Sequence, residues 1–258
     1  MDDNTYPRRG LAMWVTQSVT DRYMRRNYQL LLKHQHPATI IFLGDLMDGG
    51  REWEDSKWLK EYNRFWNVFK TPEGVNVITT IPGNHDIGLG DGIQIDRLDR
   101  FKTHFTSVNR TSECFRLGAF DIVLLDSPSL LSEDPLVSEA QLTFLERAVT
   151  KLQLDAGRLL FTHIPLWRHA DSNCGPQRES EKGIVMGGGY QYQNMLSEEL
   201  SMKILDSCWP LTAIFSGDDH DYCVVNHTFE GRREKVPEYT VKSFSWAMVL
   251  VPLRHSAN

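Results

Sequence analysis

Side chains that can bind a metal or carry a proton follow four apolar segments of this sequence. The segments end in "GDLMDGG" (44–50), "PGNHD" (82–86), "THIP" (162–165) and "SGDDHD" (216–221). These ends supply the carboxylate, amide and imidazole groups of Asp45, Asp48, Asn84, His85, Asp86, His163, Asp218, Asp219, His220 and Asp221. Such groups are common protein ligands of Mn²⁺, Fe and Zn²⁺. Any one of these residues alone has an ordinary structural explanation, but the four ends together predict a metal site.

The apolar segments that lead into these ends are typical of strands buried on both faces. Each begins with about five aliphatic or β-branched residues and stops at Gly, Pro, Asn, Asp or His. We expect strands within residues 38–45, 75–86, 120–127, 158–165 and 211–221. Because the loops that follow the strands of an α/β sheet gather at one edge, these strands can bring the polar ends together.

Segments with helical periodicity lie between the expected strands. We expect a helix over residues 20–35 with Thr20 as its N-cap, and another over 138–153 that opens with a Ser138–Gln141 capping box. A third helix is expected over residues 193–208, and a final pair of strands over 238–252. Alternating strands and helices predict a layered α/β fold, which we interpret as one domain over residues 1–258.

The composition excludes several classes of protein. The 258 residues are 41% hydrophobic and 24% charged, as in a globular protein, and the net charge of −6 does not favour a nucleic-acid partner. No stretch approaches the ~18 apolar residues of a transmembrane helix, and the polar first residues do not resemble a signal peptide. The four cysteines could form two disulfides or none. Asn109 and Asn226 begin glycosylation triplets that matter only in a secretory compartment.

The order of the polar motifs resembles the calcineurin-like metallophosphoesterase family. The motifs "GDLMD", "GNHD", "THIP" and "GDDH" follow one another at intervals similar to those of the family, over nearly the whole chain. Five further segments, "DDNTYP", "TDRYMRRNY", "NCGPQRES", "GGGYQYQN" and "SGDDHDYC", are similar to one membrane-bound branch. That branch removes ethanolamine phosphate from the glycan of GPI anchors. The resemblance implies an α/β fold in which a β-sandwich is flanked by helices in four layers (αββα).

The resemblance also implies a role for each site residue. Asp45 would bridge two divalent metal ions, with Asn84, His163 and Asp218 on the second metal and His220 on the first. Mn²⁺ is the expected ion, with Zn²⁺ or Fe as alternatives. A hydroxide between the metals would attack phosphorus, while the catalytic His85 protonates the leaving oxygen and Asp48 orients its ring. Three residues would contact the substrate or hold a ligand: Asp86, Arg178 and Asp219. Asp221, like Asp219, could fix a metal ligand in place, and the alternative for both is a side chain that points to solvent or caps the turn.

One family motif does not occur in this sequence. The family begins with Asp-x-His or Asp-x-Gln after a first strand, whereas this chain opens with "MDDNTYPRR". The first metal is then left with Asp45 and His220 as ligands. We therefore expect that the N-terminal strand is missing and that the chain is truncated at its N-terminus.

The expected function is a metal-dependent phosphodiesterase that acts on the glycan of GPI anchors or of GPI-anchored proteins. Its expected location is the membrane of the endoplasmic reticulum or Golgi, with the catalytic domain in the lumen and the membrane segments outside this chain. Two alternatives remain. One is a different metallophosphoesterase, such as a protein phosphatase, nucleotidase or nuclease, and the other is a non-catalytic fragment that binds one metal.

Overall fold

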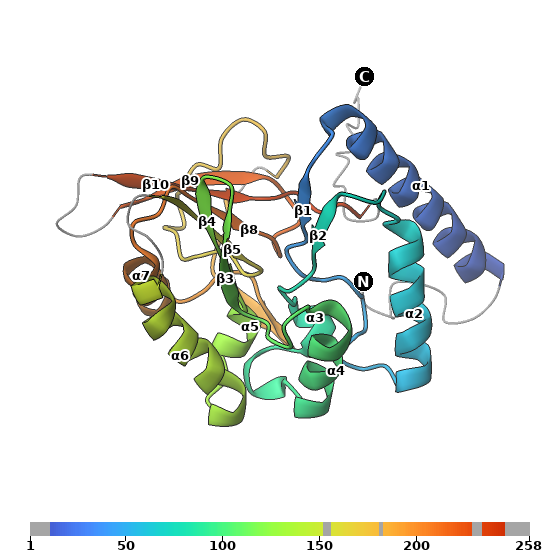
Figure 1. The fold of residues 1–258 in the computed structure, drawn as a ribbon, viewed down its shortest axis with the longest axis horizontal. Helices are drawn as coiled ribbons and strands as arrows, with labels where there is room; N and C mark the ends of the chain where they lie inside the picture. Colours follow the sequence, from blue (N-terminus) through green and yellow to red (C-terminus); the bar gives the residue numbers. More distant parts are fainter. Residues whose placement is uncertain (1–10, 152–155, 181–182, 229–233, 246–258) are drawn as a thin grey trace, which may run out of the picture.

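The computed structural model describes residues 11–151, 156–180, 183–228 and 234–245 (Figure 1). Strands and helices alternate along most of this part of the chain, as expected. None of its helices combines the length and the apolar character needed to cross a membrane.

The larger sheet is mixed and has the strand order β3-β4-β5-β8-β10-β9. Its strands are β3 (Glu113–Leu117), β4 (Phe120–Leu125), β5 (Gly157–Thr162), β8 (Ala213–Ser216), β9 (Cys223–Thr228) and β10 (Lys235–Thr240). The four central strands, β4, β5, β8 and β10, run parallel, while β3 and β9 pair antiparallel at the two edges. The carboxyl ends of the parallel strands therefore lie along one edge of the sheet.

A second sheet packs face to face on the first. It consists of β1 (Thr39–Ile41) and β2 (Asn76–Ile78), which run parallel with Ile40 opposite Val77. A cluster of apolar side chains joins the two sheets, with Ile41 and Ile78 on one side and Ile122, Leu124 and others on the opposite side. The two sheets thus form a β-sandwich.

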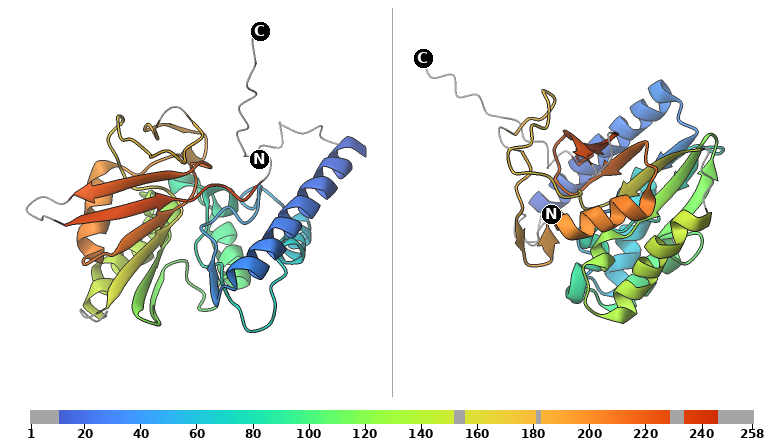
Figure 2. Two further views of the ribbon diagram at one scale, coloured as in Figure 1. Left: turned by 90° about the horizontal axis from the view of Figure 1, so that it is seen from above. Right: turned by 90° about the vertical axis from the view of Figure 1, so that its left-hand side faces the viewer.

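Helices cover both outer faces of the sandwich (Figure 2). The larger sheet packs against α5 (Ser127–Leu130), α6 (Pro135–Lys151) and α7 (Glu198–Cys208). On the side of the smaller sheet lie α1 (Leu11–Gln35), α2 (Asp55–Val68), α3 (Asn84–Ile87), the short helix η1 (Gly90–Gly92) and α4 (Ile95–Phe105). These layers confirm the predicted α/β class with a sandwich between helices.

Successive residues of β4 explain why its sequence is apolar throughout. Ile122 and Leu124 point into the sandwich, whereas Val123 and Leu125 point toward the helices on the other face. Both sets are buried, because a strand with two covered faces has no side exposed to water.

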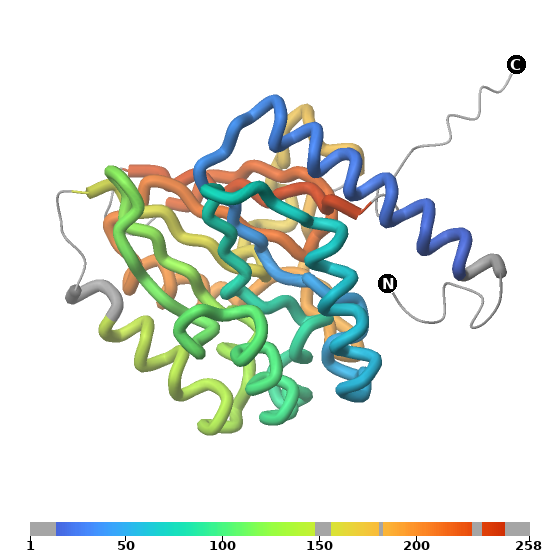
Figure 3. Tube along the Cα trace, turned by 45° about the vertical axis from the view of Figure 1, so that its right-hand side comes forward, coloured from blue at the N-terminus to red at the C-terminus, as the bar shows by residue number. Residues whose placement is uncertain are grey.

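All three expected helix starts were wrong, and the third helix, α7, begins at Glu198 instead of residue 193. Helix α1 begins at Leu11, so Thr20 is a buried residue inside the helix and not its N-cap. The N-terminal end of α1 projects beyond the rest of the molecule, where Trp14 is 64% exposed (Figure 3). Helix α6 begins at Pro135, and Ser138 bonds to the carbonyl of Asp134 instead of forming a capping box with Gln141.

The expected strand pair near the C-terminus was also placed incorrectly. Strand β10 includes the first residues of that segment, but its partner is β9, which precedes it in the chain. Residues 246–252 of the predicted pair lie outside the described residues. Strand β9 alternates between buried and less buried positions at an edge of the sheet, so its sequence lacks the continuous apolar run that indicated the other strands.

Candidate metal centre

Three of the predicted ligands meet at the carboxyl ends of the strands. Asp45 follows β1, His163 follows β5 and Asp218 follows β8. One ligand atom from each lies within 4.8 Å of the other two. The Nε2 atom of His163 is 3.5 Å from Oδ1 of Asp45 and 3.4 Å from Oδ1 of Asp218. Two carboxylates and an imidazole so close together form a suitable site for a divalent cation.

The loops that carry these ligands have unusual backbone conformations. Asp45, Asp218 and His220 all have positive φ angles, of 52°, 60° and 66°. Such angles are uncommon outside glycine, and they occur preferentially at functional turns. The backbone of Gly83 packs directly against the carboxylate of Asp45. A Cβ atom at this position would lie 2.0 Å from Oδ1 of Asp45, so the close approach requires glycine. The turns are therefore shaped to aim these side chains inward.

Asn84 brings an amide oxygen to the same cluster. It is the first residue of α3, and its Oδ1 lies 3.3 Å from Nε2 of His163. Its Nδ2 donates a hydrogen bond to the backbone carbonyl of Gln191 at 2.6 Å. The amide oxygen of Asn84 thus faces the position where a cation would lie.

The charges of the cluster indicate that it is built for a cation. Burial lowers the pKa of His163, but the carboxylates of Asp45 and Asp218 outweigh this effect and raise it to about 10. For Asp45, burial raises the pKa, but His163 and His85 lower it overall. One oxygen of Asp218, Oδ2, is buried without a hydrogen-bond partner. A buried carboxylate oxygen with no partner is costly, and a bound cation would remove that cost.

The ring of His163 is already oriented for metal binding. Its Nδ1 lies 2.7 Å from the carbonyl oxygen of Leu43 and donates to it. This bond leaves Nε2 facing the carboxylates, an arrangement that is common for histidine ligands. The residues present therefore fit a divalent metal.

His85 lies beside this cluster and is held by the backbone of Asp48. Its Nδ1 is 2.7 Å from the carbonyl oxygen of Asp48, whereas the carboxylate of Asp48 is farther away at 3.6 Å. The ring is thus oriented mainly by the carbonyl group and not by the predicted carboxylate. Burial lowers the pKa of His85 to about 4, so the ring is neutral at pH 7. It must gain a proton before it can protonate a leaving group.

His220 is close to the cluster but outside its compact core. Its side chain lines the same cavity as Asp45, Asp48 and His85. Its carbonyl group accepts a hydrogen bond from the backbone of Ser243. Asp45 and His220 would together hold the other metal ion.

Asp86 connects two of the loops and does not face the cluster. Its carboxylate accepts hydrogen bonds from the backbone N–H groups of Leu46, Met47 and Gly83. Burial, together with the charge of Asp45, raises the pKa of Asp86 to about 7. Asp86 therefore holds the loop after β1 against the start of α3.

Asp219 and Asp221 hold the loop around residue 178. Arg178 forms an ion pair with Asp219 at 2.6 Å, so its guanidinium is engaged by a carboxylate. Asp221 accepts hydrogen bonds from the backbone N–H groups of Glu179 and Ser180. Neither aspartate points freely to solvent, so the interpretation that these side chains are solvated is wrong.

A disulfide joins the same loop to the larger sheet. Cys174 bonds to Cys223, the first residue of β9, while Cys114 and Cys208 are thiols. One disulfide matches neither of the two expected alternatives, which were two or none. The spacing of the cysteines could not reveal this pairing, because Cys174 lies in a loop.

The hairpin of residues 187–194 contributes contacts that the sequence did not indicate. It contains β6 (Gly188–Gly189) and β7 (Tyr192–Gln193). Gln191 bonds to Asn84. Burial and the carboxylates of Asp218 and Asp219 raise the pKa of Tyr192 to about 12, so its hydroxyl stays protonated. Only the resemblance of "GGGYQYQN" to the family branch pointed to this segment.

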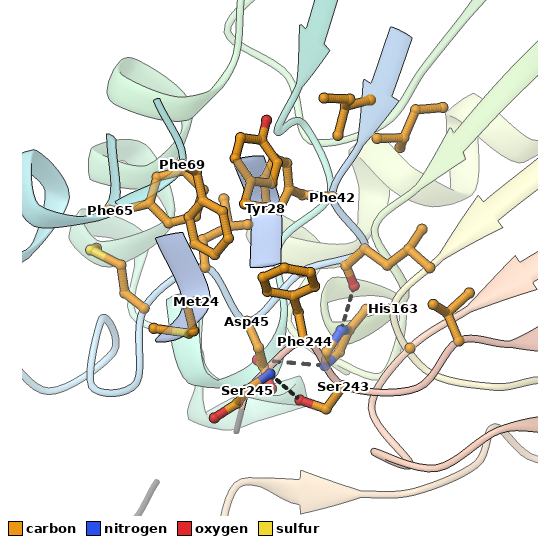
Figure 4. A pocket seen from close by; sticks show the side chains of 18 of the residues that line it. Met24, Tyr28, Phe42, Asp45, Phe65, Phe69, His163, Ser243, Phe244 and Ser245 are labelled. Atoms are coloured by element: carbon orange, nitrogen blue, oxygen red, sulfur yellow. Dashed lines mark hydrogen bonds and ion pairs between the residues drawn. The ribbon is translucent and has the colours of Figure 1, made fainter. Parts of the chain in front are cut away.

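A cavity of about 830 Å³ lies next to the cluster (Figure 4). Asp45 and His163 line one end, and aromatic side chains such as Tyr28, Phe42 and Phe69 line the other. Within the described residues, β1 pairs with β2 along one edge only. The cavity also borders β1. It extends from the metal centre to the aromatic side chains at its other end.

The chain is similar to several known proteins. The chain is 38% identical over 254 residues to Cell division control protein 1 of Saccharomyces cerevisiae. The alignment covers 96% of this chain and 50% of that protein. The chain is 29% identical over 260 residues to Metallophosphoesterase 1 of Xenopus laevis, covering 90% of this chain and 62% of that protein. The chain thus spans about half to two thirds of the length of these relatives. The structure of this chain superposes on that of a dimetal phosphatase from Danio rerio with a TM-score of 0.47 and 13% sequence identity. The superposition covers 87% of this chain and 78% of the phosphatase chain.

A family model extends over most of the chain. The model described as calcineurin-like phosphoesterase matches residues 20–222, a range that contains all the predicted site residues. The chain belongs to the calcineurin-like phosphoesterase family.

Proposed function

We propose that this chain hydrolyses phosphoesters with divalent metal ions held by Asp45, Asn84, His163 and Asp218, and with His220 on a second ion. The observation that carries the proposal is the buried cluster in which Oδ2 of Asp218 lacks a hydrogen-bond partner. Bound divalent ions would lower the pKa of a water molecule and neutralise charge on the phosphate. Mn²⁺ is the ion we favour, because the set is rich in oxygen donors and Asp218 adds a further carboxylate; Zn²⁺ and Fe are alternatives.

The residues around the cluster have distinct tasks in this proposal. Asp45 and Asp218 bring the negative charge that concentrates cations at the site. His85 donates Nδ1–H to the carbonyl of Asp48, which leaves its Nε2 as the atom that can take up a proton and pass it to a leaving oxygen. Because its pKa is about 4, His85 would hold that proton only transiently.

We propose a phosphodiester substrate, ethanolamine phosphate on a mannose of the GPI-anchor glycan, either free or on GPI-anchored proteins. The support is the similarity of five sequence segments to the family branch with that activity. A location in the lumen of the endoplasmic reticulum or Golgi is proposed with it, because disulfides such as Cys174–Cys223 persist in oxidising compartments. Attachment to the membrane would be through segments outside this chain.

Hydrolysis by the purified chain tests this proposal. We expect the chain with Mn²⁺ to release ethanolamine phosphate from the glycan, and to cleave bis(p-nitrophenyl) phosphate faster than p-nitrophenyl phosphate. Both reactions would stop when a chelator is added and in the Asp45→Asn variant. Cleavage of monoesters alone would overturn the diester substrate and favour a protein phosphatase or nucleotidase.

A second candidate is a protein that binds one metal without catalysis. One observation favours it: within the described residues, Asp45, His163 and Asp218 form one compact set of ligand atoms, and His220 lies outside it. Metal binding without hydrolysis of any phosphoester would support this candidate.

A further inference from the structure

The hairpin of residues 187–194 is fastened to the metal centre at Gln191. The backbone carbonyl of Gln191 accepts a hydrogen bond of 2.6 Å from Nδ2 of Asn84. Its side-chain oxygen, Oε1, accepts another of 2.6 Å from the backbone N–H of Leu89, just after α3. Gln191 also has a positive φ of 53°, which turns the chain sharply at the tip of the hairpin. Two separate hydrogen bonds thus join one residue to both ends of α3.

The side chain of Gln191 occupies a space that glycines leave open. A Cβ atom on Gly92 would lie 1.6 Å from Nε2 of Gln191, and one on Gly88 would lie 3.0 Å from its Oε1. The first of these distances is far below any normal contact, so a side chain at Gly92 would displace Gln191. The loop of residues 88–92 is therefore shaped to receive this glutamine.

The contact with Gln191 decides which end of the Asn84 amide faces the cluster. With Nδ2 on the Gln191 carbonyl, Oδ1 points toward Nε2 of His163. If the amide turned over, two oxygen acceptors would face each other and the N–H groups would point at the cation position. Both consequences are unfavourable, because oxygen acceptors repel each other and an N–H group does not bind a cation.

We propose that Gln191 is a positioning residue that keeps the amide oxygen of Asn84 available to the metal. The inference rests on the proposed function, since it treats Asn84 as a ligand. Residues that orient a metal ligand commonly affect metal affinity by about 10- to 100-fold when they are replaced. The hairpin is then a wall of the metal centre and not only a surface loop.

Mn²⁺ affinity of the whole chain, measured by competition with a chelating dye, tests the proposal. We expect Gln191→Ala to weaken binding by about 10- to 100-fold, because the anchor on Leu89 is lost and the hairpin carbonyl is no longer fixed. Gly92→Ala keeps Gln191 in the sequence but fills the space that its side chain occupies. We expect this variant to weaken Mn²⁺ binding to a similar extent. The matched controls are Gln193→Ala and Gly189→Ala in the same hairpin, where Gly189 has open space around it. Both controls are expected to bind as the wild type does.

A metal-free measurement separates positioning from a general loss of structure. In the nuclear magnetic resonance spectrum of the metal-free chain, the Nδ2 protons of Asn84 are expected to shift in Gln191→Ala and in Gly92→Ala while the melting temperature stays near that of the controls. If both variants fold and bind Mn²⁺ as tightly as the wild type, the role of Gln191 is wrong and the proposed function stands. If the wild type binds neither Mn²⁺ nor the alternative ions Zn²⁺ and Fe²⁺, both are overturned.

Discussion

Asp218 is the residue whose environment is hardest to explain without a metal. It is buried, one of its oxygens lacks a hydrogen bond, and the other lies 3.4 Å from His163. We predict that Asp218→Asn weakens Mn²⁺ binding at least tenfold, because a carboxylate contributes charge that an amide does not. The melting temperature of the metal-free protein at pH 7 is expected to fall as well, because the amide removes one of the two carboxylates that stabilise the charged form of His163. Dye competition and thermal unfolding measure the two effects, and unchanged Mn²⁺ affinity would rule out Asp218 as a ligand.

The raised pKa of His163 predicts opposite pH effects on stability and on metal binding. Its pKa is about 10 in the folded metal-free chain, above the ordinary value of 6.5. The stability from its charged form is therefore complete below pH 6.5 and is lost as the pH rises toward 10. Over the same range Mn²⁺ affinity is expected to rise by about tenfold per pH unit, because the metal displaces one proton. Urea unfolding and Mn²⁺ titration at several pH values test this, and both trends are expected to disappear in His163→Gln.

At the scale of elements, strand ends explain how much of the site the sequence could predict. Asp45, His163 and Asp218 follow strands whose apolar runs are visible in the sequence, although β1 is only half-buried and not covered on both faces as expected. The contacts of Gln191 were not visible, because they depend on a hairpin of two-residue strands and on tertiary packing against α3. The strand β9 escaped prediction for a similar reason, since its pattern makes sense only beside β10.

A buried ion-pair network around Glu238 predicts how the stability of the larger sheet changes at low pH. Glu238 of β10 contacts Arg168 at 2.8 Å and His227 of β9 at 2.6 Å. Burial raises the pKa of Glu238, but Arg168 and His227 outweigh this and lower it to about 2 from 4.5. Its contribution to stability is thus present above pH 4.5 and is lost as the pH falls toward 2.

Replacing this carboxylate tests the network. Glu238→Gln is expected to lower the free energy of unfolding at pH 7 by about 3–5 kcal/mol, because Arg168 would remain buried without its partner. Urea unfolding from pH 5 to pH 2 is expected to show a smaller loss of stability in the variant than in the wild type. A variant as stable as the wild type at pH 7 would show that the ion pair contributes little.

At the scale of the whole molecule, one disulfide connects the loop around residue 174 with the sheet. Cys174 and Cys223 are 49 residues apart in the sequence. Reduction is expected to lower the free energy of unfolding by about 2–4 kcal/mol, mainly because the unfolded chain gains freedom. Urea unfolding with and without a reductant measures this loss. In Cys174→Ala the reductant is expected to have no further effect, and an equal response of both proteins would contradict the assignment.

The proposed metal centre joins four separate segments of the chain in one site. The most direct measurement is elemental analysis of the purified chain after equilibration with Mn²⁺ and removal of free metal. We expect at least one bound ion per chain, lost in the Asp45→Asn variant because Asp45 is proposed as a ligand of both ions. A wild-type chain that retains no metal, although it is folded, would contradict the proposed metal centre.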